Sequence, residues 1–153
     1  MYKRQLFKYR GKTLLARPLG ILLLDAMKRL PRVDCLVPVP LHPSRLRERE
    51  FNQALLLCDF LKAESGLPVI HDGLERIRET PPQIGLSHKD RPRNVRRAFV
   101  PKRPEQIEGR RIALIDDVLT TGATVNDCAR ALKRAGAESV CVLTIARTPV
   151  GMG

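Results

Sequence analysis

Residues 111–124 read Arg111-Ile112-Ala113-Leu114-Ile115-Asp116-Asp117-Val118-Leu119-Thr120-Thr121-Gly122-Ala123-Thr124. The unbroken apolar run at the start is typical of a strand buried on both faces inside a parallel sheet. Two carboxylates end this run, and a short loop of small and hydroxylated residues follows. Helical periodicity then places Val125, Ala129 and Leu132 on one side, and Gly136 should end the helix in a left-handed conformation. Because ligands of open α/β sheets bind where such strands end, a site is expected here.

The loop has residue types that suit a sugar phosphate. Small residues let backbone amides approach an anion, and the start of the following helix adds a partial positive charge. The hydroxyls of Thr120, Thr121 and Thr124 can donate to phosphate oxygens. Asp116 and Asp117 are acceptors that suit the hydroxyls of a sugar or a divalent cation. A sugar phosphate therefore satisfies both halves of the stretch, whereas a bare phosphate satisfies only one.

The stretch from Ile112 to Thr124 resembles, position by position, the phosphoribosyl-pyrophosphate (PRPP) motif of the type I phosphoribosyltransferases. The wider chain is similar to the ComF (competence protein F) family over residues 37–42, 45–54 and 78–94. The resemblance implies an α/β type I phosphoribosyltransferase fold, with a mostly parallel sheet, flanking helices and a small hood over residues 78–94. Residues 1–153 would then form a single domain. The alternative is a response-regulator or hydrolase strand that also ends in acids.

The resemblance implies a role for each motif. In the related enzymes PRPP arrives with Mg²⁺, and a nucleophile displaces pyrophosphate from ribose C1 through an oxocarbenium-like transition state. Asp116 and Asp117 would hold the ribose hydroxyls and the magnesium. The 5′-phosphate would lie against Thr120, Thr121, Gly122, Ala123 and Thr124. The pyrophosphate loop would comprise Val39, Pro40, Leu41, His42, Arg45 and Arg49, and the flexible loop would use Gln83, Lys89 and Arg91. No residue is assigned as a general base.

Two of these loops have simpler explanations as well. Arginines between residues 45 and 49 can grip a diphosphate bidentately, but a solvated charged turn has the same composition. Glu50 stands where family members commonly have glycine, and a glutamate does not easily take a positive φ angle. Its charge would also face a diphosphate, which puts turnover in question. Residues 78–94 are long and polar, as in a lid or in a disordered basic loop.

Charge and hydropathy narrow the partners and the location. The 153 residues carry a net charge of +12, which favours polyanions such as PRPP, pyrophosphate or nucleic acid, although a merely basic soluble protein has that charge too. No apolar stretch approaches the roughly 20 residues that span a bilayer. The basic N-terminus lacks the hydrophobic core of a signal peptide. A cytoplasmic protein without membrane insertion is therefore predicted.

Four scattered cysteines, Cys35, Cys58, Cys128 and Cys141, form no C-x-x-C pair. They are predicted to be small buried hydrophobes, and no zinc is expected. ComF proteins usually carry an N-terminal four-cysteine zinc module before the transferase-like domain. This sequence begins inside what would be the linker. We therefore expect either a truncated version of a longer protein or a member that has lost the module.

The other elements follow from periodicity and from glycine and proline positions. Helices are predicted at 13–30, where Pro18 sits one turn in and Pro31 ends the helix, and at 51–65, with Gly66 as the stop. Strands are predicted at 34–37, within 67–77, at 95–100 and at 139–146, and residues 102–110 are predicted to be a charged turn.

Two classes of function remain open. The first is a glycosyltransferase of nucleotide metabolism that transfers a phosphoribosyl group from PRPP to an unidentified nitrogen acceptor. The second is a non-catalytic module that binds PRPP and single-stranded DNA and acts with competence proteins in DNA uptake. Aromatic residues make up only 4% of the chain, which is few for base stacking. The oligomeric state is open, and a homodimer is one of the outcomes.

Overall fold

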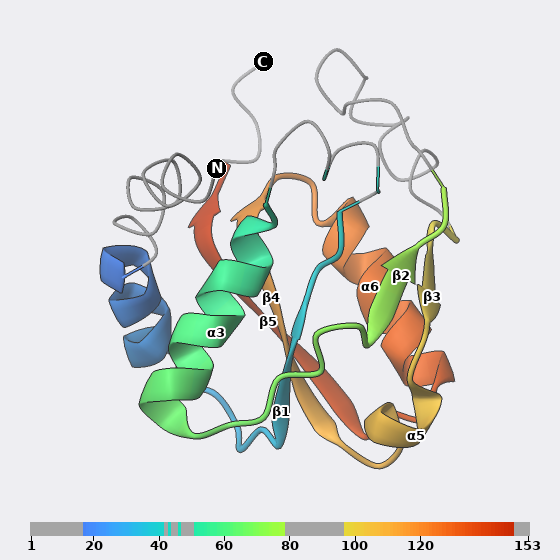
Figure 1. Cartoon of the computed structure of the whole chain (residues 1–153), viewed down its shortest axis with the longest axis horizontal. Coiled ribbons are helices and arrows are strands. Elements are labelled where there is room, and N and C mark those ends of the chain that lie inside the picture. The colour runs from blue at the N-terminus through green and yellow to red at the C-terminus, as the bar shows by residue number, and fades with distance from the viewer. Residues whose placement is uncertain (1–16, 42, 44–45, 47–50, 79–96, 149–153) are drawn as a thin grey trace, which may run out of the picture.

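A computed structural model describes residues 17–41, 43, 46, 51–78 and 97–148. Three parallel strands form the central sheet in the order β1-β4-β5 (Figure 1). Their bounds are Cys35–Pro38 for β1, Arg111–Leu119 for β4 and Ser139–Arg147 for β5. A separate antiparallel pair consists of β2, Leu74–Arg76, and β3, Phe99–Pro101.

The central strand β4 is buried on both faces, as its apolar run predicts. Ile112, Ala113, Leu114 and Ile115 are all fully buried. Side chains alternate across a strand, so the four residues serve two cores. Ile112 and Leu114 belong to one hydrophobic cluster, and Ala113 and Ile115 belong to the other.

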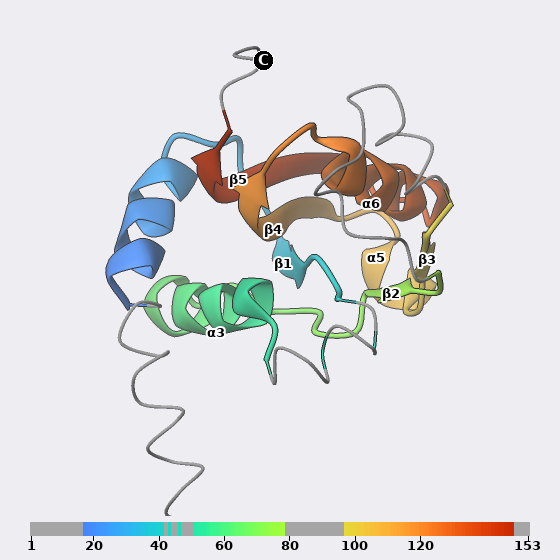
Figure 2. The same cartoon turned by 90° about the horizontal axis from the view of Figure 1, so that it is seen from above.

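Helices cover both faces of the sheet (Figure 2). On one face lie the helix of residues 17–27 and α3, Gln53–Ser65, which contribute Leu23, Leu57 and Leu61 to the core. On the other face lies α6, Ala123–Arg134, which contributes Val125, Cys128 and Leu132. The layers are helix, sheet and helix, which is the doubly covered arrangement expected for a parallel sheet.

Several predicted boundaries are confirmed. The first predicted strand ends at Pro38, as prolines require, and β5 covers the predicted range with one residue more. Gly66 follows α3 with φ 73°, and Gly136 follows α6 with φ 88°. Both glycines thus end their helices in the left-handed region, where L side chains are disfavoured.

Other boundaries differ from the predictions. The strand β4 does not stop at the two acids but runs on to Leu119, because β5 continues to pair with it through Leu119↔Arg147. Part of the predicted charged turn is a four-residue helix, α5, Pro104–Ile107, which buries Ile107. The first helix ends at residue 27, three residues earlier than expected. The strand predicted at 95–100 also differs: among the described residues, β3 begins at Phe99 and ends at Pro101.

The buried side of α6 also differs from the prediction. Ala129 is only partly buried, whereas Cys128 and Ala131 are fully buried. Asp127 lies on the same buried side and is 4% exposed. The periodicity had favoured the apolar residues alone, and a buried acid is not part of that pattern.

The cysteines behave largely as predicted. Cys35, Cys58 and Cys128 are buried, Cys141 is half-buried, and all four are free thiols. Burial raises the pKa of each thiol, so these side chains stay neutral. They pack as small apolar groups.

Within the described residues, no helix has both the length and the apolar character that a bilayer crossing requires.

Candidate functional site

The two acids at the end of β4 are held by the strand's own backbone. The amide of Asp117 donates to Oδ1 of Asp116 at 3.0 Å. The amide of Val118 donates to Oδ1 of Asp117 at 2.8 Å. Asp116 also lies opposite Thr144 in the β5 ladder. Both carboxylates are thus fixed at the carboxyl end of the central strand, where ligands of such sheets bind.

The carboxyl group of Asp116 has a raised pKa. Burial of the carboxyl group raises its pKa to about 7, and the charge of Asp117 adds to this effect. Near neutral pH the carboxyl group of Asp116 is therefore protonated in part of the unliganded molecules. A cation or a set of hydroxyl donors would favour the ionised form of Asp116.

After β4, the loop leads directly into α6. Gly122 precedes the helix with φ 78°, a conformation that favours glycine, although a Cβ there would meet only ordinary contacts. Oγ1 of Thr121 accepts from the amide of Ala123 at 3.4 Å. The twelve-residue α6 points its N-terminus at this loop. Helix starts leave backbone amides without intrahelical acceptors, which suits an anion.

The end of β1 lies beside the acids. The amide of Val39 donates to the carbonyl oxygen of Ile115 at 2.9 Å, so the β1 side of the ladder continues to the residue before Asp116. The side chain of Asn52 donates from Nδ2 to the carbonyl oxygen of Val39 at 3.0 Å. Its Oδ1 accepts from the amide of Ala54 and caps α3. Asn52 thus ties the exit of β1 to the start of α3.

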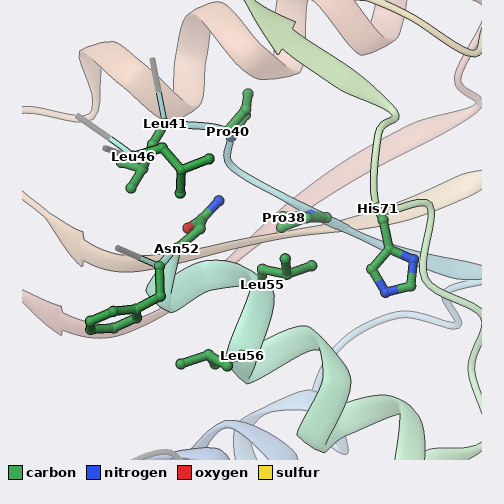
Figure 3. A pocket seen from close by; sticks show the side chains of 9 residues that line it. Pro38, Pro40, Leu41, Leu46, Asn52, Leu55, Leu56 and His71 are labelled. Carbon is green, nitrogen blue, oxygen red and sulfur yellow. The ribbon is translucent and has the colours of Figure 1, made fainter. Parts of the chain in front are cut away.

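A cavity of about 360 Å³ lies next to this exit (Figure 3). Prolines, leucines and Phe51 make most of its wall, and Asn52 and His71 add polar groups. Figure 3 shows Leu55 and Leu56 on α3, and His71 on the segment before β2. Nε2 of His71 lies 3.0 Å from Oδ1 of Asp59. The residues that line the cavity are Pro38, Pro40, Leu41, Leu46, Phe51, Asn52, Leu55, Leu56 and His71.

The structure brings together two of the predicted groups. Asp116 and Asp117 lie in the last part of β4, and residues 120–124 form the loop and the start of α6 that follow it. Residues 39–41 leave the neighbouring strand β1. His42, Arg45 and Arg49 of the predicted pyrophosphate loop lie outside the described residues. So do Gln83, Lys89 and Arg91, with nearly all of the predicted hood.

The donor set suits a magnesium ion that arrives with a ligand. In the part of the chain that the structure describes, no three His, Cys, Asp or Glu side chains converge on one point. Mg²⁺ needs no such cage, because it usually takes one or two carboxylates and completes its octahedron with substrate phosphates and water. The carboxylates of Asp116 and Asp117 fit that role.

Sequence reasoning missed two polar residues near the site. Asn52 had a local signal, because asparagine is a favoured N-cap residue directly before a helix. Asp127 had only an indirect signal: it lies four residues before Ala131, on the buried side of α6. The cavity had no local signal, since its wall combines the exit of β1, the start of α3 and the segment before β2.

Comparison with known proteins identifies the class. The family model of the phosphoribosyl transferase domain matches residues 75–152, which is just over half of the chain. The chain therefore belongs to the phosphoribosyl transferase domain family.

Curated relatives place it within the ComF group of that family. It is 35% identical over 150 residues to Competence protein F of Haemophilus influenzae, covering 94% of this chain and 66% of the relative. It is 40% identical over 119 residues to the DNA utilization protein YhgH of Salmonella typhi, covering 78% and 52%. Identity to Competence protein ComFC of Bacillus subtilis is 37% over 114 residues, covering 74% and 44%. The chain thus spans less than two thirds of the length of these relatives.

Solved structures agree on the fold. Glutamine PRPP amidotransferase from B. subtilis superposes with a TM-score of 0.55 at 23% identity, covering 83% of this chain and 25% of that one. The protein TT1426 from Thermus thermophilus gives a TM-score of 0.52 at 15% identity, covering 90% and 86%. The predicted α/β fold of the type I phosphoribosyltransferases is confirmed.

Proposed function

We propose that this chain binds PRPP with Mg²⁺ and transfers its phosphoribosyl group to a nitrogen acceptor, with release of pyrophosphate. The observation that carries the proposal is the junction of β4 and α6. There, two fixed carboxylates and a threonine-rich loop meet at one end of the sheet, in a domain of the phosphoribosyl transferase family. Acids alone would suit a metal, and the loop alone would suit an anion. Their combination suits a sugar phosphate.

In this proposal the residues divide between the parts of PRPP. Asp116 and Asp117 accept hydrogen bonds from the ribose hydroxyls and contribute oxygens to the magnesium coordination. Residues 120–124 donate to the 5′-phosphate from hydroxyls and backbone amides. Residues 39–41 lie on the pyrophosphate side, where the resemblance adds His42, Arg45 and Arg49. Magnesium, when bound, neutralises charge on the diphosphate.

The proposed reaction needs electrostatic support more than covalent chemistry. The bond from ribose C1 to the pyrophosphate oxygen breaks, the electron pair leaves with pyrophosphate, and the acceptor nitrogen forms the new bond to C1 and loses a proton. Positive charge develops on the sugar ring during this step. Carboxylates fixed near the ribose stabilise that charge without reorganising, which is how preorganised polar groups lower a barrier. A dedicated base for the proton is not assigned.

A panel of nucleobases and amines with PRPP and Mg²⁺, assayed for pyrophosphate release, tests the proposal and its acceptor. Binding is tested separately by thermal unfolding, because a ligand that binds only the folded state raises the melting temperature with concentration. A protein that is folded but shows no shift at millimolar PRPP would contradict the PRPP site. A rise in melting temperature with PRPP, without pyrophosphate release for any acceptor, would support PRPP binding and contradict the transfer reaction.

A second candidate is a non-catalytic module that binds PRPP and single-stranded DNA in competence. It is favoured by the names of the relatives, Competence protein F and DNA utilization protein YhgH, and by the net charge of +12. Both candidates place the protein in the cytoplasm, and the charge suits binding to a phosphate backbone, whose affinity falls steeply with salt. Titration of labelled oligonucleotides at several salt concentrations distinguishes this candidate from the transferase.

A further inference from the structure

Asp127 is a buried charge that the proposed PRPP site does not use. It lies in the second turn of α6 and is 4% exposed, and among the described residues no other charged side chain is as buried. A buried carboxylate is costly unless hydrogen bonds replace its lost water. Three backbone amides supply them: Arg97 donates to Oδ1 at 3.0 Å, and Ala98 and Phe99 donate to Oδ2 at 2.9 and 3.3 Å.

The three donors lie where the chain enters β3. Arg97 has φ 55° and is the only described residue other than glycine with a positive φ. The following amides are turned toward α6 rather than toward solvent. The carbonyl of Ala98 accepts from the amide of Ile77 at 2.9 Å, so the same point also closes the pair β2–β3. The guanidinium of Arg76 lies over the ring of Phe99, with its carbon 5.5 Å from the ring centre.

The same helix begins at the loop proposed to hold the 5′-phosphate. Asp127 lies one turn after Ala123, and the amide of Asn126 bonds to the carbonyl of Gly122 at 2.9 Å. A displacement of the loop would therefore move the carboxylate. Because that carboxylate accepts from three consecutive residues 28 to 30 positions earlier, it would move the entry to β3 as well.

We propose that Asp127 is a positioning residue that locks α6 to the backbone of residues 97–99. Through this contact, occupation of the phosphate loop stabilises the chain where it returns to β3. A carboxylate is required because both of its oxygens accept. An asparagine would turn an NH₂ group toward an amide donor and lose at least one bond. This inference rests on the proposed function only where a phosphate ligand is used.

Hydrogen exchange on the full chain tests the proposal in two arms. In unliganded protein, Asp127→Asn should speed exchange in residues 97–101 by at least about tenfold while β4 keeps its protection. Asp34→Asn is the matched control, because Asp34 also accepts from a backbone amide but lies at the opposite end of β4. It should speed exchange in residues 97–101 no more than in β4, whereas Asp127→Asn should act on residues 97–101 selectively. Parental exchange of residues 97–101 in Asp127→Asn would overturn the proposal.

The ligand arm uses ribose 5-phosphate. In the parent it should slow exchange in residues 120–126 and also in 97–101. In Asp127→Asn the slowing should persist at 120–126 and disappear at 97–101, a change that a uniform loss of stability would not produce. Slowing of both segments in the variant would overturn the coupling. If ribose 5-phosphate does not slow exchange at 120–126 in the parent, the proposed phosphate site is contradicted. The experiment on unliganded protein would still test the contact of Asp127 with residues 97–99.

Asp127→Glu is the second variant if the asparagine variant does not fold. It keeps the charge and both acceptor oxygens but displaces them by one methylene group. Exchange in residues 97–101 should then lie between the rates of the parent and of a peptide without structure. Parental rates in this variant would show that the position of the carboxylate does not matter and would overturn the proposal.

Discussion

At the scale of single residues, the site holds a carboxyl group, that of Asp116, whose ionised form is disfavoured by the fold. Asp116 is half-buried beside a second acid, and its pKa is raised to about 7, chiefly by burial. An unfolded aspartate has a pKa of about 3.9. The folded form therefore binds a proton more tightly than the unfolded form between these two values. Folding stability contributed by this group is highest below pH 4 and is lost as the pH rises toward 7.

We predict that Asp116→Asn stabilises the unliganded protein at pH 8 by about 1–3 kcal/mol, because it removes the cost of a buried charge. The gain should become small near pH 4, where the parental carboxyl group is protonated in the folded state and about half protonated in the unfolded state. Urea unfolding of both proteins in metal-free buffer from pH 4 to pH 8 measures it. Parallel pH profiles would show that Asp116 does not carry this cost. Removing the acid should also weaken PRPP binding, as expected when a functional site is built at the expense of stability.

Asp117→Asn and Thr121→Val should both weaken PRPP binding, for different reasons. The first removes charge that magnesium needs, so its effect should grow with Mg²⁺. The second removes a donor to the 5′-phosphate, so its effect should be the same with and without Mg²⁺. A hydrogen bond to a charged group is worth about 1.5–3 kcal/mol, so a loss of about tenfold to a hundredfold is expected.

Calorimetric titration with ribose 5-phosphate and with PRPP, each with and without Mg²⁺, separates the two roles. Thr121→Ser is the control for the hydroxyl group and should bind nearly as the parent does. If Asp117→Asn binds PRPP as tightly as the parent at every Mg²⁺ concentration, the acids do not hold the ribose. The proposed ribose site would then be wrong.

At the scale of elements, the first helix is positioned by one close approach. Gly20 is buried against α3, and a Cβ at this position would lie 2.2 Å from Cδ1 of Phe60 and 2.7 Å from Cγ. These atoms belong to the rigid part of the ring rather than to the end of a flexible chain. The absence of a side chain at Gly20 thus sets how closely the two helices pack on this face of the sheet.

We predict that Gly20→Ala destabilises the protein, although alanine favours a helix by about 1 kcal/mol over glycine. Overpacking of this kind costs about 1–3 kcal/mol, so the clash should win. Urea unfolding of Gly20→Ala, Phe60→Ala and the double variant measures it. In the double variant the space left by the ring should absorb the added methyl group, so the two effects should not add. Strict additivity would show that the two side chains do not meet.

At the scale of the whole molecule, what could be predicted depended on how local the signal was. The apolar run of β4, its two acids and Gly136 lie within one continuous stretch, and their placement in strand and helix followed directly. The extension of β4 to Leu119 could not be predicted, because it depends on pairing with β5. The antiparallel partnership of β2 and β3 is likewise non-local. Asp127 was missed because its partners lie about thirty residues earlier in the chain.

The candidate site divides in the same way. The acids and the threonine loop are contiguous in sequence, so their proximity in space follows from the strand and helix alone. The neighbourhood of Val39 and Ile115 required knowledge that β1 lies beside β4. The role of Asn52 could be recognised only from the two contacts of its side chain, with the carbonyl of Val39 and the amide of Ala54. Residue roles for PRPP stay predictions, because the fold places these groups without testing what they bind.

At the end of the sheet opposite the candidate site, Asp34 and Arg111 form an ion pair. Nη2 and Nε of Arg111 donate to the two carboxylate oxygens at 2.7 and 3.0 Å, and the amide of Arg111 donates to Oδ2 at 2.9 Å. The pair aligns the starts of β1 and β4 across 77 residues of chain. The bonds from the Arg111 side chain and amide hold the pKa of Asp34 well below its ordinary value.

A lowered pKa gives the opposite pH dependence to that of Asp116. The stabilisation by Asp34 is fully present above the unfolded pKa of about 3.9 and is lost as the pH falls below it. We predict that Asp34→Asn lowers the urea midpoint by the same amount at every pH from 6 to 8. Below pH 4 the difference from the parent should shrink as protonation weakens the parental pair. Asp25→Asn is the control, because Asp25 pairs with Arg29 in an exposed position and such pairs contribute little. If Asp34→Asn and the parent unfold at the same urea concentration at pH 7, this pair does not hold the two strands in register, and the parallel ladder alone sets it.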